Sequence, residues 1–259
     1  MDDGGFEGLG GIEEQSVPDL LRDVRFDADK TLVSQIFEII RRLIITVQLK
    51  PGQKISENEI SEALKASKTP VREALIRLED AGLVTIVPKS GSFVAPIRID
   101  RYIDACFIRL QLETGAVRRA ALLAQRDVAV LDGIIDDQVV ALDAGEYGRF
   151  FALDESLHHA IFDISGVGGV WETAKRAQTE LYRIRHLKRI CGIRRGPLIV
   201  EQHREISAAI SGGSPDEAEA ALVRHIGSLE QEIASLSMTP GLFDHIENLN
   251  KRQTRHRRT

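Results

Sequence analysis

The sequence predicts a mostly α-helical protein, in which a small N-terminal unit of three helices and a β-hairpin precedes an all-α antiparallel helical bundle. Three observations lead to this fold class. Apolar residues recur at three- and four-residue steps over most of the chain, as in amphipathic helices. Two runs rich in β-branched residues stand close together, at residues 83–87 and 92–95. The 259 residues are enough for one large domain or two small ones.

The composition excludes several classes of protein. The longest apolar runs, such as residues 43–47, are far shorter than the ~18 residues of a membrane-spanning helix. The N-terminus is acidic and lacks the basic region of a secretory signal. The two cysteines, Cys106 and Cys191, cannot form a disulfide framework. We therefore expect a cytoplasmic protein and exclude extracellular, membrane-spanning and cysteine-based zinc proteins.

Charge is distributed unevenly along the chain, although the net charge is only −5. Residues 1–29 carry 2 basic and 9 acidic side chains, whereas residues 30–98 carry 11 basic and 7 acidic ones. A cationic block inside an anionic chain favours a module that binds a polyanion such as nucleic acid. A surplus of this size is also common on an ordinary solvated surface, so charge alone does not decide the question.

The same patterns divide the chain into four segments. Residues 1–29 are rich in glycine and acidic residues, so we expect a disordered arm. Residues 30–98 hold the three helices and the hairpin, and residues 99–237 hold the helical bundle. Residues 238–259 form a tail that is basic at its end.

Capping and breaking residues delimit the elements of residues 30–98. A first helix begins at Thr31 and ends at the Pro-Gly of residues 51–52. A second begins at Ser56, which has capping-box spacing with Glu59. A third begins between residues 67 and 69 and ends at Gly82. With the hairpin, whose tip at residues 88–91 is basic, these helices predict a winged helix-turn-helix.

In a helix-turn-helix protein, the second helix of the motif enters the major groove and its N-terminal residues read the base edges. Lys68 and Arg72 lie one turn apart on the face opposite Val71 and Leu75, and Arg72 can donate to both O6 and N7 of a guanine. The basic hairpin tip is suited to phosphates or a minor groove. The alternative is that these residues form an ordinary polar helix face and turn without a role in DNA binding. The candidate DNA-binding residues are Ser67, Lys68, Thr69, Arg72, Arg77, Lys89, Ser90 and Gly91.

From residue 99 onward the pattern is helical throughout. Helical periodicity covers residues 100–124, 128–142, 147–165, 168–192, 198–211 and 215–236, and glycine-containing breaks separate most of these segments. Six helices with short connections predict an antiparallel bundle.

Four residues of this bundle have the spacing of a metal site. Asp154 and His158 are four residues apart on one helix and share a face. The Ser-Pro turn at residues 214–215 folds two helices back on each other, which brings His203 and His225 level at ~1.5 Å per residue. Three histidines and one carboxylate suit Zn²⁺, Ni²⁺ or a similar divalent ion. Spacing alone equally allows core or surface histidines and a solvated aspartate.

Several stretches resemble known bacterial regulators. The residues Pro51-Gly-Gln-Lys-Ile-Ser-Glu, Thr69-Pro-Val-Arg-Glu-Ala-Leu and Pro88-Lys-Ser-Gly-Ser-Phe-Val resemble the DNA-binding domain of GntR-family transcription regulators. One departure is Lys68, where relatives usually carry arginine. The residues Phe151-Ala-Leu-Asp-Glu-Ser-Leu-His, Glu201-Gln-His-Arg-Glu-Ile and Arg224-His-Ile resemble the FCD effector domain of the FadR subfamily, over about residues 100–236.

This resemblance implies a ligand-responsive transcription regulator that acts as a repressor. Its bundle would form a homodimer on a pseudo-palindromic operator in double-stranded DNA. Asp154, His158, His203 and His225 would hold a divalent metal, and Arg109 would face a small carboxylic acid effector such as a sugar acid. The alternative is a metal-dependent hydrolase or lyase with an accessory winged helix. Because the sequence lacks HExxH, GxSxG and a phosphate-binding loop, we expect that the protein is not an enzyme.

Overall fold

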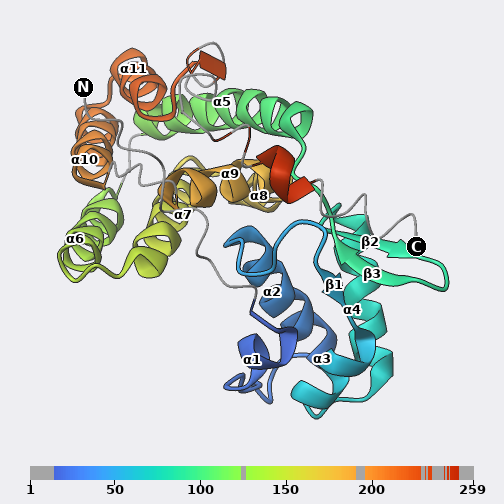
Figure 1. Ribbon diagram of the computed structural model, residues 1–259. Coiled ribbons are helices and arrows are strands. Elements are labelled where there is room, and N and C mark those ends of the chain that lie inside the picture. The colour runs from blue at the N-terminus through green and yellow to red at the C-terminus, as the bar shows by residue number, and fades with distance from the viewer. Residues whose placement is uncertain are drawn as a thin grey trace. The chain divides into compact units, whose positions relative to one another are not determined.

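A computed structural model describes residues 15–123, 127–190, 196–228, 231, 233–234, 242, 244 and 246–250. The chain forms two compact units, and each is described by itself. The first unit consists of residues 1–99, 180–192 and 237–259, and the second of residues 100–179 and 193–236. Figure 1 labels the elements of both units.

The N-terminal part of the first unit contains the three predicted helices. Thr31 and Ser56 cap the first two, because their hydroxyl groups accept hydrogen bonds from the N–H groups of Ser34 and Glu59. The helices pack around a core of aliphatic side chains that includes Ile40, which is fully buried. The three helices are α2 (Leu32–Ile45), α3 (Glu57–Ala63) and α4 (Lys68–Asp80).

The predicted hairpin is also present and carries an additional strand. Strands β2 (Val84–Val87) and β3 (Gly91–Val94) pair antiparallel, with Thr85 opposite Phe93. A strand of two residues, β1 (Lys54–Ile55), adds to the other edge of β3, so the sheet order is β1-β3-β2. The sequence does not predict β1, because two residues are too few to show an alternating pattern.

The prediction of a disordered arm over residues 1–29 is wrong for its second half. Residues 1–14 lie outside the described residues, but α1 (Val17–Leu21) follows them. Ser16 caps this helix with its hydroxyl group, and Val17 and Leu21 are buried in the same core as α2. Burial of these two apolar side chains offsets the entropic cost of ordering a short polar segment.

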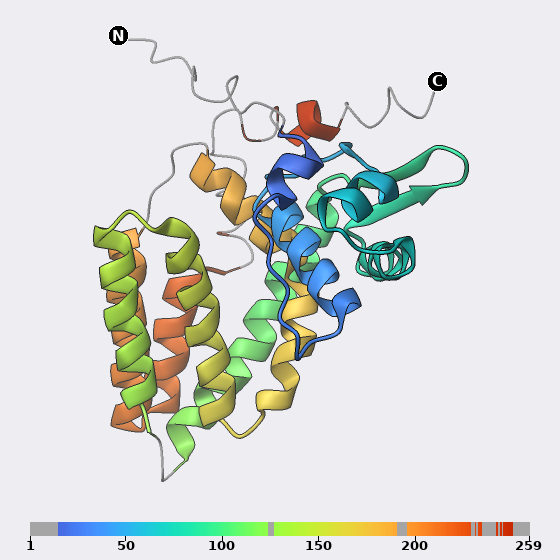
Figure 2. The same cartoon turned by 90° about the horizontal axis from the view of Figure 1, so that it is seen from below.

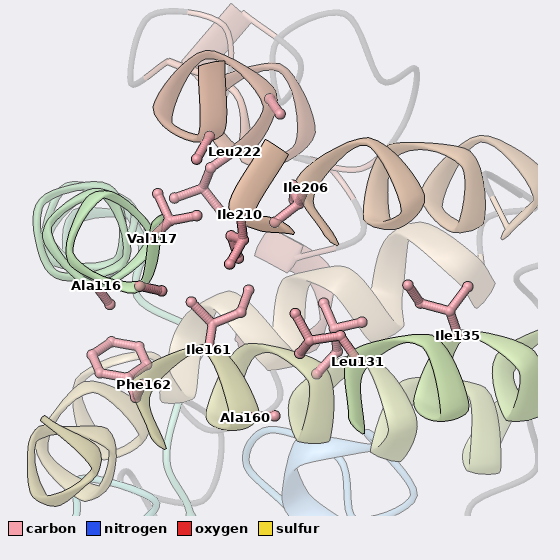
Figure 3. Close-up of a cluster of buried hydrophobic side chains, with 14 of the residues drawn as sticks. Ala116, Val117, Leu131, Ile135, Ala160, Ile161, Phe162, Ile206, Ile210 and Leu222 are labelled. Atoms are coloured by element: carbon pink, nitrogen blue, oxygen red, sulfur yellow. The ribbon is translucent and has the colours of Figure 1, made fainter. Parts of the chain in front are cut away.

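The second unit is a helical bundle, as the sequence predicts. In Figure 2, α6, α7, α10 and α11 run alongside one another in the bundle. Figure 3 shows apolar side chains from these helices and from α5 (Ile99–Leu122) meeting in one core, among them Val117, Leu131, Ile161, Ile210 and Leu222. The helices are α5 (Ile99–Leu122), α6 (Ala129–Asp143), α7 (Tyr147–Ile164), α10 (Gly196–Gly212) and α11 (Pro215–Ile226).

The single helix expected over residues 168–192 is instead three elements. These are the 3₁₀ turn η1 (Gly168–Val170), α8 (Trp171–Ala177) and α9 (Thr179–Ile190). The break falls at Gln178, which is 1% exposed and donates from Nε2 to Oε1 of Glu113 at 3.4 Å. The helix expected over residues 215–236 likewise ends earlier, at Ile226, because Gly227 adopts a φ of +83°.

Within the first unit, helix α9 and the C-terminal segment both bind residues 95–97. Arg183 is fully buried, and its guanidinium donates to the carbonyl oxygens of Ala95 at 2.9 Å and Pro96 at 3.2 Å. The side-chain amide of Asn250 exchanges two hydrogen bonds of 2.9 Å with the backbone of Ile97. Residues 95–97 therefore obtain their polar partners from distant parts of the sequence. None of the described helices is long and apolar enough to cross a membrane.

Candidate functional site

The predicted reading helix is α4, and its polar face is exposed. Ser67 is the N-cap residue and makes no side-chain capping hydrogen bond. Val71, Ala74, Leu75 and Leu78 bury the opposite face in the core of the first unit. The polar residues that the sequence singles out, Ser67, Lys68, Thr69, Arg72 and Arg77, are all exposed.

Arg72 makes a contact that the sequence does not predict. Its Nε lies 3.4 Å from Oε2 of Glu57, the first residue of α3. The Arg72 side chain is 72% exposed, so this ion pair contributes little to stability. The contact places the guanidinium near the N-terminal end of α4, the part of the helix that reads bases in helix-turn-helix proteins.

The hairpin tip has an unusual backbone. Lys89 adopts a φ of +65° and Gly91 a φ of +119°, a region that favours glycine. A side chain at Gly91 would also lie 3.0 Å from Cε of Lys54. Lys54 is exposed, so strand β1 adds a cation beside the basic tip formed by Lys89 and Ser90. The carboxylate of Glu79 near the end of α4 accepts a 2.8 Å hydrogen bond from the N–H of Ile86, which ties the hairpin to the helix.

A second cluster lies inside the bundle. Helix α7 supplies Asp154 and His158, α10 supplies His203, and α11 supplies His225. All four side chains are buried, and one ligand atom from each lies within 4.8 Å of the others. The structure therefore brings together the four residues that the sequence selects as metal ligands.

The three imidazole rings face one another through the same atom. Nε2 of His203 lies 3.2 Å from Nε2 of His225, which in turn lies 3.3 Å from Nε2 of His158. Oδ1 of Asp154 is 3.6 Å from Nε2 of His203. Three ring nitrogens and a carboxylate oxygen thus converge on one small volume.

His203 and His225 each have an acceptor at the other ring nitrogen. Oε1 of Gln138 lies 2.8 Å from Nδ1 of His203, and Oε1 of Gln202 lies 3.2 Å from Nδ1 of His225. An amide oxygen can only accept, so the proton of each neutral ring is at Nδ1 and the lone pair is at Nε2. Oε2 of Glu113 is 2.9 Å from Nδ1 of His158, an ion-pair contact without good hydrogen-bond alignment.

The surroundings oppose protonation of His225. Burial, followed by the nearby rings of His203 and His158, holds the pKa of His225 well below its ordinary value. Burial alone would raise the pKa of Glu113, but Arg109 and His158 outweigh it and lower that pKa to about 2. His225 is therefore neutral, whereas the nearby carboxylate of Glu113 is ionised.

These donors fit a divalent metal ion. Lone pairs that face one another at 3.2–3.3 Å repel unless a cation or proton lies between them. Imidazole nitrogens with one carboxylate are typical ligands of Zn²⁺ and Ni²⁺, and the acceptors at Nδ1 are the partners that orient ligating histidines. The cluster is thus a candidate metal centre.

Arg109, the predicted effector residue, lies directly beside the cluster. It is 7% exposed, and its Nη2 lies 2.8 Å from Nε2 of His158. Its Nε donates to Oε1 of Glu113 at 3.0 Å. One turn of α5 separates Arg109 from Glu113, so a single helix supplies both charges.

Sequence reasoning missed the residues that orient the histidines. The spacing of Arg109 and Glu113, four residues apart on one helix, is a signal that could have identified the glutamate. Gln138 carries no such signal, because it reaches His203 only through the packing of α6 against α10. Of the other described histidines, neither His159 nor His186 belongs to the cluster. His159 stacks on Trp171, and His245 and His256 lie outside the described residues.

Comparisons with known proteins agree with this architecture. Residues 32–94 match the gntR family of bacterial regulatory proteins, and residues 104–228 match the FCD domain. The chain is 37% identical to an uncharacterized HTH-type transcriptional regulator in an unstable DNA locus of Streptomyces ambofaciens, over 80% of this chain and 88% of that protein. It is 28% identical to the HTH-type transcriptional repressor RspR of Escherichia coli K12, over 78% and 89% of the two chains.

Among solved structures, E. coli McbR/YncC has a similar fold, with a TM-score of 0.68 and 23% identity over 80% of this chain and 98% of that one. The family matches and the named relatives point to a transcriptional regulator rather than to a metal-dependent hydrolase or lyase. The chain belongs to the GntR family of bacterial regulatory proteins, as a DNA-binding transcriptional regulator that carries an FCD domain.

Proposed function

We propose that this regulator is a repressor whose affinity for its operator is controlled by a small carboxylic acid, such as a sugar acid, bound beside a divalent metal in the helical domain. The single observation that carries this proposal is the convergence of three histidine Nε2 atoms on one point next to Asp154. The relative RspR is named a transcriptional repressor, which supports repression rather than activation.

The metal would be Zn²⁺ or Ni²⁺, held by Asp154, His158, His203 and His225. Four protein ligands leave two positions open on an octahedral ion, and such an ion supplies a positive centre for a carboxylate and an adjacent hydroxyl. Arg109 would bind the same carboxylate, because its guanidinium borders the cluster and offers a planar pair of donors.

Operator binding would use residues 30–98 as the reading domain, while residues 99–237 bind the effector and join two chains into a homodimer. A symmetric dimer would present two DNA-binding domains, one for each half-site of a pseudo-palindromic operator. The base-reading and phosphate-binding side chains would be Ser67, Lys68, Thr69, Arg72 and Arg77 of α4, with Lys89, Ser90 and Gly91 at the hairpin tip.

The test compares His203→Ala with His159→Ala. His203 is fully buried in the cluster, whereas the side chain of its matched control, His159, is 46% exposed on α7. We expect the wild type and His159→Ala to hold about one Zn²⁺ or Ni²⁺ per chain, as measured by elemental analysis after dialysis against the metal. His203→Ala should lose the metal and any thermal shift caused by carboxylic acids, yet keep its basal operator affinity in gel-shift assays.

Two outcomes would contradict the proposal. A wild type that cannot be loaded with Zn²⁺ or Ni²⁺ would refute the metal centre. A full response of operator binding to carboxylic acids in metal-free His203→Ala would show that the histidines have only a structural role.

A further inference from the structure

The contact between Arg109 and His158 uses an atom that the proposed metal also needs. Nη2 of Arg109 lies 2.8 Å from Nε2 of His158. A guanidinium can only donate, so Nε2 must accept through its lone pair. The same lone pair is the one that His158 would offer to a metal ion, and one lone pair cannot serve both partners.

We infer that Arg109 acts as a latch: its guanidinium occupies Nε2 of His158 until a metal ion binds there. Metal binding at Nε2 of His158 displaces the guanidinium, and the released Nη2 end then becomes available to the carboxylate of the effector. The inference rests on the proposed function and adds to it an order of events: metal first, carboxylate second. It also makes Arg109 a residue with two alternative partners rather than a fixed part of a carboxylate pocket.

Glu113 limits how far the latch can move. Its Oε1 accepts from Nε of Arg109 at 3.0 Å, and Gln178 donates to the same carboxylate oxygen at 3.4 Å. Glu113 is 2% exposed and belongs to the same helix as Arg109. Because Nε stays bound to Glu113, displacement affects the Nη2 end of the guanidinium and leaves the charge beside the cluster.

This arrangement couples the two ligands. A carboxylate that arrives without metal must compete with His158 for Arg109, and a metal that arrives without carboxylate must break a buried hydrogen bond. Once one ligand has broken the hydrogen bond between Arg109 and His158, the other ligand no longer spends free energy on breaking it. Each ligand should therefore raise the affinity of the other by the same factor.

The experiment measures Zn²⁺ affinity by competition with a chromophoric chelator at constant pH, with and without acetate as the carboxylate probe. Arg109→Lys keeps the positive charge but offers one ammonium, which cannot reproduce the two-ended contact with Glu113 and His158. We expect its Zn²⁺ affinity to rise about tenfold in the absence of acetate, the effect of removing one buried charge-assisted hydrogen bond. The gain in Zn²⁺ affinity that acetate gives the wild type should be smaller in Arg109→Lys, because only direct coordination of acetate to the ion then couples the two ligands.

Two further variants control this result. Arg119→Lys, on the same helix, should behave as the wild type, because Arg119 donates to the carbonyl oxygen of Ser165 away from the cluster. If Arg109→Lys does not fold, as judged by circular dichroism, Arg109→Gln is measured in its place, with the same direction expected.

The outcomes separate this inference from the proposed function. If the wild type binds no Zn²⁺, the proposed metal centre fails and the latch fails with it. If the wild type binds Zn²⁺ but the Arg109 variant binds it equally or more weakly, the latch alone is overturned. Equal acetate coupling in the wild type and the variant would also overturn it.

Discussion

Replacing Gln138 with leucine tests whether the acceptors behind the histidines prepare the cluster for a metal. Gln138 is fully buried, and its Oε1 lies 2.8 Å from Nδ1 of His203. Leucine keeps the size of the side chain but leaves a buried ring N–H without an acceptor, at a cost of about 1–3 kcal/mol. The ring is then free to turn or to move its proton to Nε2, and loss of such an orienting partner typically lowers metal affinity about 10–100-fold.

Gln202→Leu is the matched comparison. Its Oε1 lies farther from its histidine, at 3.2 Å from Nδ1 of His225, and the side chain is partly exposed, so water can replace it. We therefore expect the loss of Zn²⁺ affinity, measured by chelator competition, to be clearly larger for Gln138→Leu. Thermal unfolding in excess chelator monitors the fold independently of the metal. Wild-type Zn²⁺ affinity in a folded Gln138→Leu protein would refute the reasoning that ring orientation prepares the site.

Three other substitutions test separate parts of the chain. Arg72→Ala should cost about 1–3 kcal/mol of specific operator binding in gel shifts, with thermal unfolding unchanged; an unaltered gel shift would remove α4 from the interface. Arg183→Met should lower the free energy of urea unfolding by about 3–5 kcal/mol, because it removes the main cation beside the buried Glu180 carboxylate. The exposed control Arg176→Met should change little, and equal effects of the two substitutions would contradict this reasoning. Burial, then Arg185 and Arg189, lowers the pKa of His186 to about 4, so the unfolded chain takes up a proton before the folded one. Stability should fall by about 3 kcal/mol between about pH 6.5 and 4, and His186→Gln should reduce that slope; an unchanged slope would assign the loss to other groups.

Helical periodicity was sufficient to predict the class of fold, because it is a local property. The capping residues Thr31 and Ser56, and the turn before Pro215, mark where helices begin. The same turn places His203 and His225 at one level, which is why spacing alone could select both. Local patterns do not predict the break at Gln178, whose buried side chain has its partner, Glu113, 65 positions away in the sequence.

The partners of the cluster were unpredictable for the same reason. Gln138 is one polar residue on an otherwise amphipathic helix, and only the packing of α6 against α10 brings it to His203. Arg183 looks like one of several basic residues in a charged helix, yet it is fully buried against the carbonyl groups of residues 95–96. Its role depends on contacts nearly ninety positions away in the sequence, which no periodicity reveals. The basic tail at residues 251–259 lies outside the described residues, and its role stays a prediction.

The pairing of Asn250 with Ile97 joins residues that are 153 positions apart. Ile97 is therefore synthesised long before its partner. A chain emerges from the ribosome N-terminus first, so α2, α3, α4 and the sheet can fold while most of the protein is still being made. The backbone of Ile97 must wait for Asn250, the last described residue, before it acquires these partners. A DNA-binding domain released early, by truncation or stalled translation, would therefore lack the two hydrogen bonds between Asn250 and Ile97. Formation of these bonds reports that synthesis has reached Asn250.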